Sequence, residues 1–243
     1  MKIGEICPTN NYGNLIIKEF HNSRKVLVEF VDTGYQVWVQ AVSIRLGNVK
    51  DKRKPSVYGV GVFDVAIKGE SSSKTYVTWS SMLARCYAKK RNKRDRSYEG
   101  CEVSEDFKVY SIFKNWYESK VGFDRETFCL DKDLLFKGNR VYSPKTCCLL
   151  PAELNLALTN SKASRGSLPV GVKYNKLNDN YVASLCINGK QVHLASCETP
   201  EQAFNIYKNA KESHLKVLAN KWKDQLEQQA YHALMDYTVT KED

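Results

Sequence analysis

The middle of the chain holds a short run of alternating charge, Asp131-Lys132-Asp133, followed by Thr146 and Asn155. A general base in hydrolysis needs a pKa near the working pH. A lysine with its ordinary pKa of about 10.4 stays protonated at neutral pH, and flanking carboxylates favour that charged form further. Histidine would suit the task, but the chain's four histidines lie elsewhere, at His21, His193, His214 and His232. We therefore expect no catalytic residue in this stretch.

The same stretch has the pattern of a strand, a loop, a second strand and a helix. Pro144 and Pro151 bracket an apolar return strand from Thr146 to Leu150. Pro151 also opens the run Pro-Ala-Glu-Leu-Asn, and proline is tolerated in the first turn of a helix. That helix would close the unit and carry Asn155.

These residues resemble the HNH-type homing endonucleases encoded by phages, and the likeness covers nearly all of the chain. The matching motifs are W-S-S-M-L-A-R-C-Y, Y-E-G-C, L-D-K-D-L-L, G-N-x-x-Y-S-P-x-T-C-C and L-P-A-E-L-N. The resemblance implies a ββα-metal fold in which Asp131 and Asn155 match possible metal ligands. Lys132 stands where the family has its general-base histidine, and Thr146 stands where it has an asparagine. The resemblance thus implies a degenerate site that holds no cofactor, with Mg²⁺ bound only if the chain is an active nuclease.

The overall charge favours a polyanionic partner. Lys and Arg number 37 against 27 Asp and Glu, which gives a net charge of +10, and a basic surface attracts nucleic acid. A soluble basic protein without such a partner is the alternative. The eight cysteines show no CxxC pair and no zinc-knuckle spacing, so we expect reduced packing residues. The first five residues lack the apolar core of a signal peptide and no run is long enough to span a membrane. We expect a protein in the cytoplasm of a bacterial host cell, with no membrane partner.

The first 68 residues have the pattern of a small antiparallel β-barrel. The runs 15–20, 26–31 and 36–39 are rich in strand-forming residues, and asparagine, aspartate and glycine separate them. Residues 1–68 are therefore predicted to form a separate β domain.

Residues 71–160 change to helical spacing before the strand–loop–strand–helix pattern begins. One helix is predicted from Thr75, and a second opens at Ser104, whose aromatic stripe we expect in the core. Between them lies a basic run that either is solvated or contacts phosphates; its members are Lys89, Lys90, Arg91, Lys93, Arg94 and Arg96.

Residues 161–168 are small, polar and basic, which indicates a linker that could contact DNA through Lys162 and Arg165. Residues 169–243 then read as three strands followed by a helix. Asn188-Gly189 is a strong hairpin signal, and Thr199-Pro200-Glu201-Gln202 is a capping box with proline in the first turn. Apolar residues at helical spacing extend this helix to near residue 237.

This C-terminal pattern resembles the DNA-reading domain of plant ethylene-response factors, in which a three-stranded sheet lies in the major groove. Side chains alternate between the two faces of a strand. If Tyr181, Ala183, Leu185, Ile187, Val192 and Leu194 pack on the helix, other residues face away from it. We expect DNA contacts from Lys173, Asn175, Lys176, Ser184, Lys190, Gln191 and His193. An exposed polar face without DNA is the alternative.

Together these patterns predict an α+β protein: an N-terminal β-barrel, a degenerate HNH domain with extra helices, and a three-stranded sheet with a long helix. The predicted function is site-specific binding of double-stranded DNA by a former homing endonuclease that acts as a repressor in a phage or a phage satellite, occupying its operator without cutting it. An active metal-dependent nuclease and a protein-interaction scaffold are the alternatives. A homodimer on a palindromic site is a further expectation.

Overall fold

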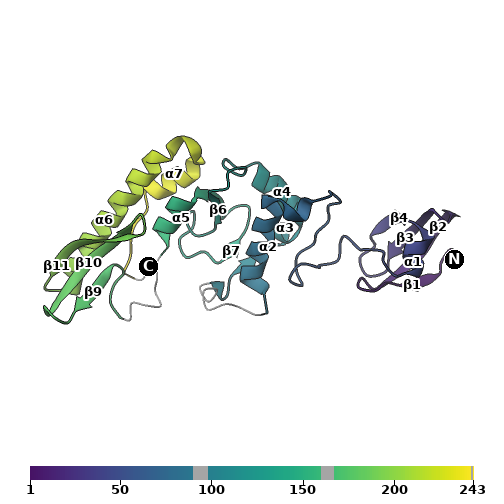
Figure 1. Ribbon diagram of the computed structural model, residues 1–243, viewed down its shortest axis with the longest axis horizontal. Coiled ribbons are helices and arrows are strands. Elements are labelled where there is room, and N and C mark those ends of the chain that lie inside the picture. Colours follow the sequence, from purple (N-terminus) through teal and green to yellow (C-terminus); the bar gives the residue numbers. More distant parts are fainter. Residues whose placement is uncertain (90–97, 160–166, 242) are drawn as a thin grey trace. The chain divides into compact units, whose positions relative to one another are not determined.

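The computed structural model describes residues 1–89, 98–159, 167–241 and 243. The chain has a mixed α+β fold with several small sheets (Figure 1). Its contacts group the residues into two compact units, 1–115 and 116–243. Within the described ranges, no helix combines the length and the apolar character needed to cross a membrane.

The first unit begins with an antiparallel sheet in the order β1-β2-β3-β4, drawn in purple in Figure 1. The strands are β1 (Ile6–Pro8), β2 (Asn14–Asn22), β3 (Lys25–Phe30) and β4 (Gln36–Val39), and the short helix α1 (Ala41–Arg45) follows. Alternate strand residues point inward, as a period of two requires, and form one core with α1: Leu15, Ile17, Val26, Val28, Phe30, Ala41, Ile44 and Val49.

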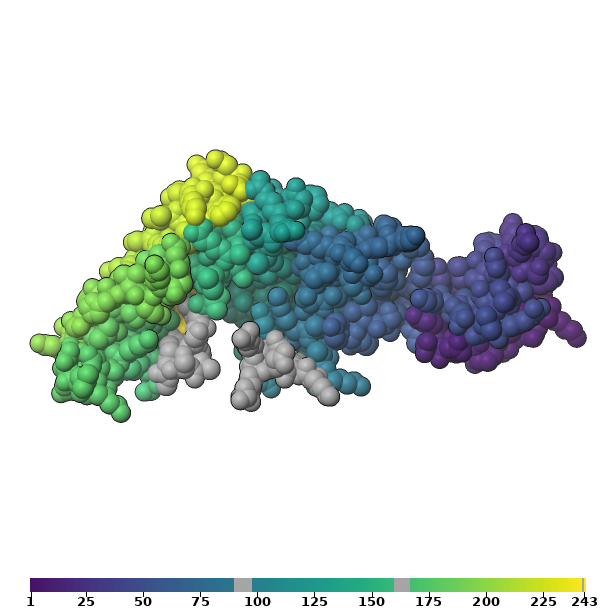
Figure 2. All heavy atoms as spheres, in the orientation of Figure 1, coloured from purple at the N-terminus to yellow at the C-terminus, as the bar shows by residue number. Residues whose placement is uncertain are grey.

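The predicted barrel is not found. Among the described residues β1 pairs with β2 and β4 pairs with β3, but no pairing joins β1 to β4. A barrel requires the first and last strands of the sheet to pair with each other, and here that closing pair is missing. The sheet instead stays open, with α1 packed into its core. Figure 2 shows the heavy atoms of the same residues as spheres, with the N-terminal part in purple.

The helices of the central part follow local signals closely. After the 3₁₀ turn η1 (Glu70–Ser72) come α2 (Lys74–Tyr87), β5 (Glu102–Val103), α3 (Glu105–Lys108) and α4 (Tyr110–Glu118). Ser73 caps α2 by accepting a hydrogen bond from the backbone N–H of Tyr76 at 3.1 Å. The helix predicted from Ser104 is broken at Val109, whose backbone is extended, so it becomes α3 and α4. Its aromatic stripe is buried, as predicted, at Phe107, Tyr110, Phe113 and Tyr117.

The second unit contains the predicted strand, loop, strand and helix. These are β6 (Phe128–Asp131), a loop that includes β7 (Val141–Tyr142), β8 (Cys148–Pro151) and α5 (Ala152–Leu158). β6 and β8 pair antiparallel, with Asp131 opposite Cys148 and Phe128 opposite Pro151.

The C-terminal sheet has the order β11-β10-β9. Its strands are β9 (Val172–Asn175), β10 (Asn180–Ile187) and β11 (Lys190–Cys197). Asn188 and Gly189 both have positive φ, 52° and 76°, as the predicted two-residue hairpin requires. The sheet packs on α6 (Pro200–Lys221), and the predicted capping box between Thr199 and Gln202 is present.

The long C-terminal helix is interrupted, contrary to the prediction. α6 ends at Lys221 with Trp222 as its C-cap, a 3₁₀ turn η4 (Lys223–Gln225) follows, and α7 (Gln228–Met235) packs back on α6 (Figure 1). This reversal lets apolar residues of α7 enter one core with α6 and the β6–β8 hairpin. The core consists of Leu134, Cys148, Leu150, Leu154, Leu218, Ala219, Leu226, Ala230 and Leu234.

Gly171 is required where β9 begins, and this generates a stability prediction. Its φ is +75°, and a Cβ there would lie 2.0 Å from Cδ2 of Tyr207. Gly189 also has positive φ but nothing within 4 Å of such a Cβ. Both glycine-to-alanine changes carry the left-handed backbone cost of roughly 1–2 kcal/mol, but only Gly171→Ala adds a clash. Urea unfolding should therefore show Gly171→Ala to be clearly less stable than Gly189→Ala, and equal losses would contradict the close packing of Tyr207.

Candidate functional site

Asp131 ends β6 and organises the turn that leaves the strand. Its Oδ1 accepts hydrogen bonds from the backbone N–H of Asp133 at 2.9 Å and of Leu134 at 2.8 Å. Burial raises the pKa of Asp131, while the hydrogen bond from Leu134 opposes that rise. Within the described residues its second oxygen, Oδ2, accepts no hydrogen bond. The carboxylate therefore has one oxygen committed to the fold and one available for a ligand.

Lys132 turns its amine into the protein. The residue is 7% exposed, and its Nζ donates to the Asn139 carbonyl at 3.0 Å and to Asp133 Oδ1 at 2.6 Å. The same nitrogen lies 5.8 Å from the ring centroid of Tyr142. The amine therefore joins the strand end to the loop, and its protons are engaged by oxygens of the protein. A group held in this way is a poor proton acceptor.

Asn139 holds the loop after β6 in place, a role that the sequence patterns did not predict. Its Nδ2 donates to the carbonyls of Lys132 and Val141, each at 2.8 Å, and its Oδ1 accepts from the Val141 N–H at 3.2 Å. Thr146 adds a bond from its Oγ1 to the same Val141 carbonyl at 2.7 Å. The signal available in the sequence was Gly138-Asn139, a turn pair in which Gly138 adopts a φ of +78°.

Asn155 lies on α5, directly after the hairpin, and is half-buried. In the described ranges, no group of three or more His, Cys, Asp and Glu side chains could hold a metal ion. A metal at this hairpin would thus depend on Asp131 and Asn155, the two residues that the sequence singled out.

The second candidate surface is the face of the C-terminal sheet that points away from α6. Cross-strand neighbours share a face, and the register places Ser184 opposite His193, Cys186 opposite Gln191, and Val182 opposite Lys173. Lys173, Gln191 and His193 are exposed and Ser184 is half-buried, so the structure brings these four predicted contacts onto one face. Lys176 and Lys190 are exposed at the strand ends.

Two details of this sheet differ from expectation. Asn175 uses its Oδ1 to accept the Leu177 N–H at 3.1 Å, which shapes the turn after β9 and engages the side chain locally. Val192 is 39% exposed, although it was expected to pack on the helix. Val192 lies opposite the buried Leu185, so it remains on the helix side of the sheet and is only partly covered there. The other expected inward residues join the core beneath the sheet: Tyr181, Ala183, Leu185, Ile187 and Leu194.

The basic segments are only partly described. Lys89, at the end of the described part before residue 98, is exposed. The other predicted phosphate contacts of these segments lie outside the described residues: Lys90, Arg91, Lys93, Arg94, Arg96, Lys162 and Arg165.

Comparisons with protein-family models, with curated proteins and with solved structures give no match for this chain.

The three bonds of Asn139 generate a prediction for Asn139→Ala. Each intramolecular hydrogen bond contributes about 1 kcal/mol net, so we expect a loss of about 1–3 kcal/mol in the free energy of unfolding. Amide exchange at Val141 should also accelerate, because its N–H loses its acceptor. Asn178→Ala, at an exposed turn position, serves as the control. If both variants unfold at the same urea concentration, Asn139 does not hold the loop.

The raised pKa of Asp131 generates a pH prediction. Because burial disfavours its ionised form, the cost is fully present above the folded-state pKa and is relieved as the pH falls through that value towards the unfolded value of about 3.9. Asp131→Asn keeps an oxygen for the two N–H groups and removes the charge. It should stabilise the protein at pH 7 and change little at pH 4, by urea unfolding at both pH values.

The control for that experiment is Asp124→Asn, which changes an exposed carboxylate of the same unit. A loss of stability at pH 7 in Asp131→Asn would contradict the burial argument and would mean that the ionised carboxylate has a favourable partner.

Proposed function

We propose that the chain is a site-specific double-stranded DNA-binding protein, related to the homing endonucleases that it resembles, which represses by occupying its site without cleaving it. The observation that carries this proposal is the state of Lys132. Where the resemblance calls for an imidazole, this amine is buried and bonded to the Asn139 carbonyl and to Asp133. A water molecule at the hairpin would lack the general base that phosphodiester hydrolysis needs.

The sheet supports the binding half of the proposal. Gln191 and Ser184 carry groups that pair with base edges, and Lys173 on the same face suits a phosphate. The exposed face is made of strands, and two- or three-stranded ribbons can enter the major groove. The net charge of +10 supplies the long-range attraction for a polyanion.

An active nuclease is the second candidate, and one observation favours it. Asp131 has an oxygen without a hydrogen bond among the described residues, and a carboxylate oxygen of this kind is a typical Mg²⁺ ligand. With Asn155 it could supply two protein ligands, and waters and a phosphate would complete the octahedron.

Binding without cleavage is the first test of this proposal. Purified protein is incubated with labelled fragments of phage or host DNA in Mg²⁺ or in EDTA, and retention and cleavage are measured together. We expect retention in both buffers and intact DNA in both. If about six phosphates are contacted, affinity should fall on the order of a thousandfold between 50 and 200 mM salt.

The variants of that test separate the two candidate functions. Lys132→His should not restore cleavage by itself, because Thr146 also departs from the family pattern. Cutting by the unaltered protein that is lost in Asp131→Ala would establish the nuclease instead. An affinity for DNA that does not change with salt concentration would contradict binding through phosphate contacts.

Base reading by the sheet is the second test. The double change Gln191→Ala with His193→Ala should narrow the affinity ratio between the selected site and random DNA, because it removes base-edge partners and leaves the phosphate contacts. Lys216→Ala on the exposed side of α6 should leave the ratio unchanged. Fluorescence anisotropy with both duplexes measures this affinity ratio. An unchanged ratio in the double variant would mean that the bases are recognised by another part of the chain.

A further inference from the structure

Lys211 on α6 is a buried charge that the fold does not neutralise. The residue is 6% exposed, and among the described residues its amine has neither a hydrogen bond nor an ion pair. The other buried acidic and basic residues in the described ranges have partners. Asp51 accepts from Thr33 at 2.6 Å, Glu70 pairs with Lys114 at 2.9 Å, and Lys132 is bonded as described above.

The neighbouring lysine on the same helix shows the contrast. Lys208 pairs with Glu212 at 3.1 Å and donates to the Val239 carbonyl at 3.0 Å. Burial of a lysine without a partner for its amine is unfavourable, so buried lysines are usually paired.

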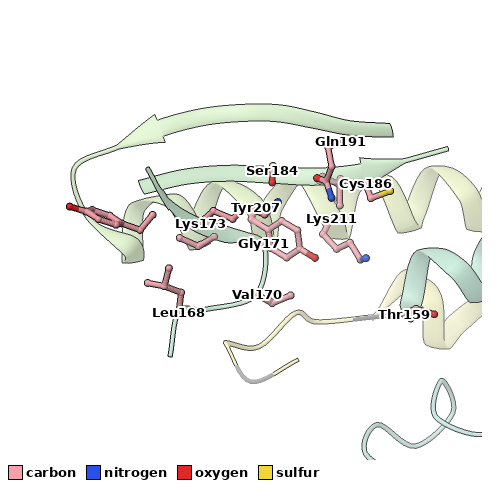
Figure 3. Close-up of a pocket in the computed structure, with 13 residues that line it drawn as sticks. Thr159, Leu168, Val170, Gly171, Lys173, Ser184, Cys186, Gln191, Tyr207 and Lys211 are labelled. Carbon is pink, nitrogen blue, oxygen red and sulfur yellow. The ribbon is translucent and has the colours of Figure 1, made fainter. Parts of the chain in front are cut away.

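Lys211 opens into a cavity of about 570 Å³ beside the C-terminal sheet (Figure 3). β9 pairs with β10 only as far as Ala183, and one further bond runs from the Ser184 N–H to the Gly171 carbonyl. The rest of that edge of β10 is not covered by β9, and this leaves the space. A smaller hollow of about 280 Å³ is also lined by Lys211.

The lining combines apolar walls with a few polar groups. Leu168, Val170 and Tyr207 supply apolar surface, and the polar residues Thr159, Ser184 and Gln191 also line the cavity. The Thr159 hydroxyl already donates to the Asn155 carbonyl at 3.0 Å. Figure 3 shows Lys211 and Tyr207 entering from α6, with the polar side chains of the sheet beside them. Sites for small molecules typically have this composition and occupy about 300–1,000 Å³.

The electrostatics of the cavity favour an anion. Burial lowers the pKa of Lys211, and electrostatic interactions with Cys186 and Asp243 oppose that change. Asp243 is itself bound to Lys137 at 2.7 Å, so it does not neutralise Lys211. The pKa of His214 is lowered by burial and by the positive charge of Lys211, while Glu153 opposes; Glu153 in turn is paired with Lys221 at 2.6 Å.

We propose that this cavity binds a small organic anion, whose carboxylate or phosphate pairs with Lys211 and whose apolar part lies against Leu168, Val170 and Tyr207. The anion would supply the hydrogen bonds and the opposite charge that the amine lacks. The site goes beyond the proposed DNA-binding function and is tested without DNA, but it shares Lys173, Ser184 and Gln191 with the proposed DNA-reading face.

Protection of Lys211 from chemical modification tests the proposal on the unaltered protein. Trace acetylation with acetic anhydride is followed by mass spectrometry of the Lys211 peptide, with the exposed Lys216 as the internal reference. Benzoate and inorganic phosphate are the probes, with chloride at equal ionic strength as the blank. At a probe concentration ten times the dissociation constant, Lys211 should react about tenfold more slowly, because about one site in eleven stays free, while Lys216 is unaffected.

A DNA duplex at the same phosphate concentration forms the third arm. If the duplex protects Lys211 and the small anions do not, the amine contacts DNA and the small-ligand proposal is overturned. Lack of protection by benzoate and phosphate also overturns it.

Thermal melting of Lys211→Met supplies an independent readout. This change roughly keeps the length of the side chain and removes its charge. Without an anion, the variant should therefore melt at a higher temperature than the parent. Benzoate should raise the melting temperature of the parent but not that of the variant. In Lys216→Met, the matched control on the same helix, benzoate should raise the melting temperature as much as in the parent. Equal gains in the parent and in Lys211→Met would overturn the proposal, and should Lys211→Met fail to fold, the acetylation experiment decides.

Discussion

Burial of one apolar cluster ties the β6–β8 hairpin to the C-terminal helices, and the rest of the second unit depends on it. Leu150 and Leu154 of the hairpin unit pack with Leu218 of α6 and Leu234 of α7. Each fully buried leucine contributes roughly 1.5–3 kcal/mol relative to an exposed one. The N-terminal half of α6 holds a second core, in which Phe204 packs beneath the sheet. One helix therefore positions both candidate DNA-contacting elements, and the reversal at Trp222 is needed to bring α7 into the first core.

The buried charged side chains differ in how far the fold supplies them with hydrogen-bond or ion-pair partners. Lys132 has a carbonyl and a carboxylate within hydrogen-bonding distance, so its charge becomes part of the loop structure. Asp131 relies on two backbone N–H groups, which offset only part of its burial. Lys211 has no such group among the described residues. Where the fold itself supplies the partner the charge is structural, and where it does not a ligand is the natural complement.

Local sequence signals predicted the elements that depend on neighbouring residues. The Asn188-Gly189 hairpin, the Thr199 capping box and the order of strand, loop, strand and helix all agree with the structure. Ser184, Gln191 and His193 were expected on one face from the alternation of side chains along a strand, and the register places them there. Asn139 was missed, because its role consists of bonds to Lys132, seven positions away, and to Val141.

The sequence by itself determined an α+β chain, its net charge, the turn positions and the absence of a histidine between residues 130 and 155. Only the tertiary structure decided that the N-terminal sheet stays open, that the last helix breaks at Trp222, and that the amine of Lys132 points into the loop. It also decided that Lys211, which no sequence pattern singled out, lies buried beside a cavity. The physical reason is range: turns and caps are set by hydrogen bonds within a few residues, whereas burial and charge pairing depend on contacts between distant segments that local patterns do not encode.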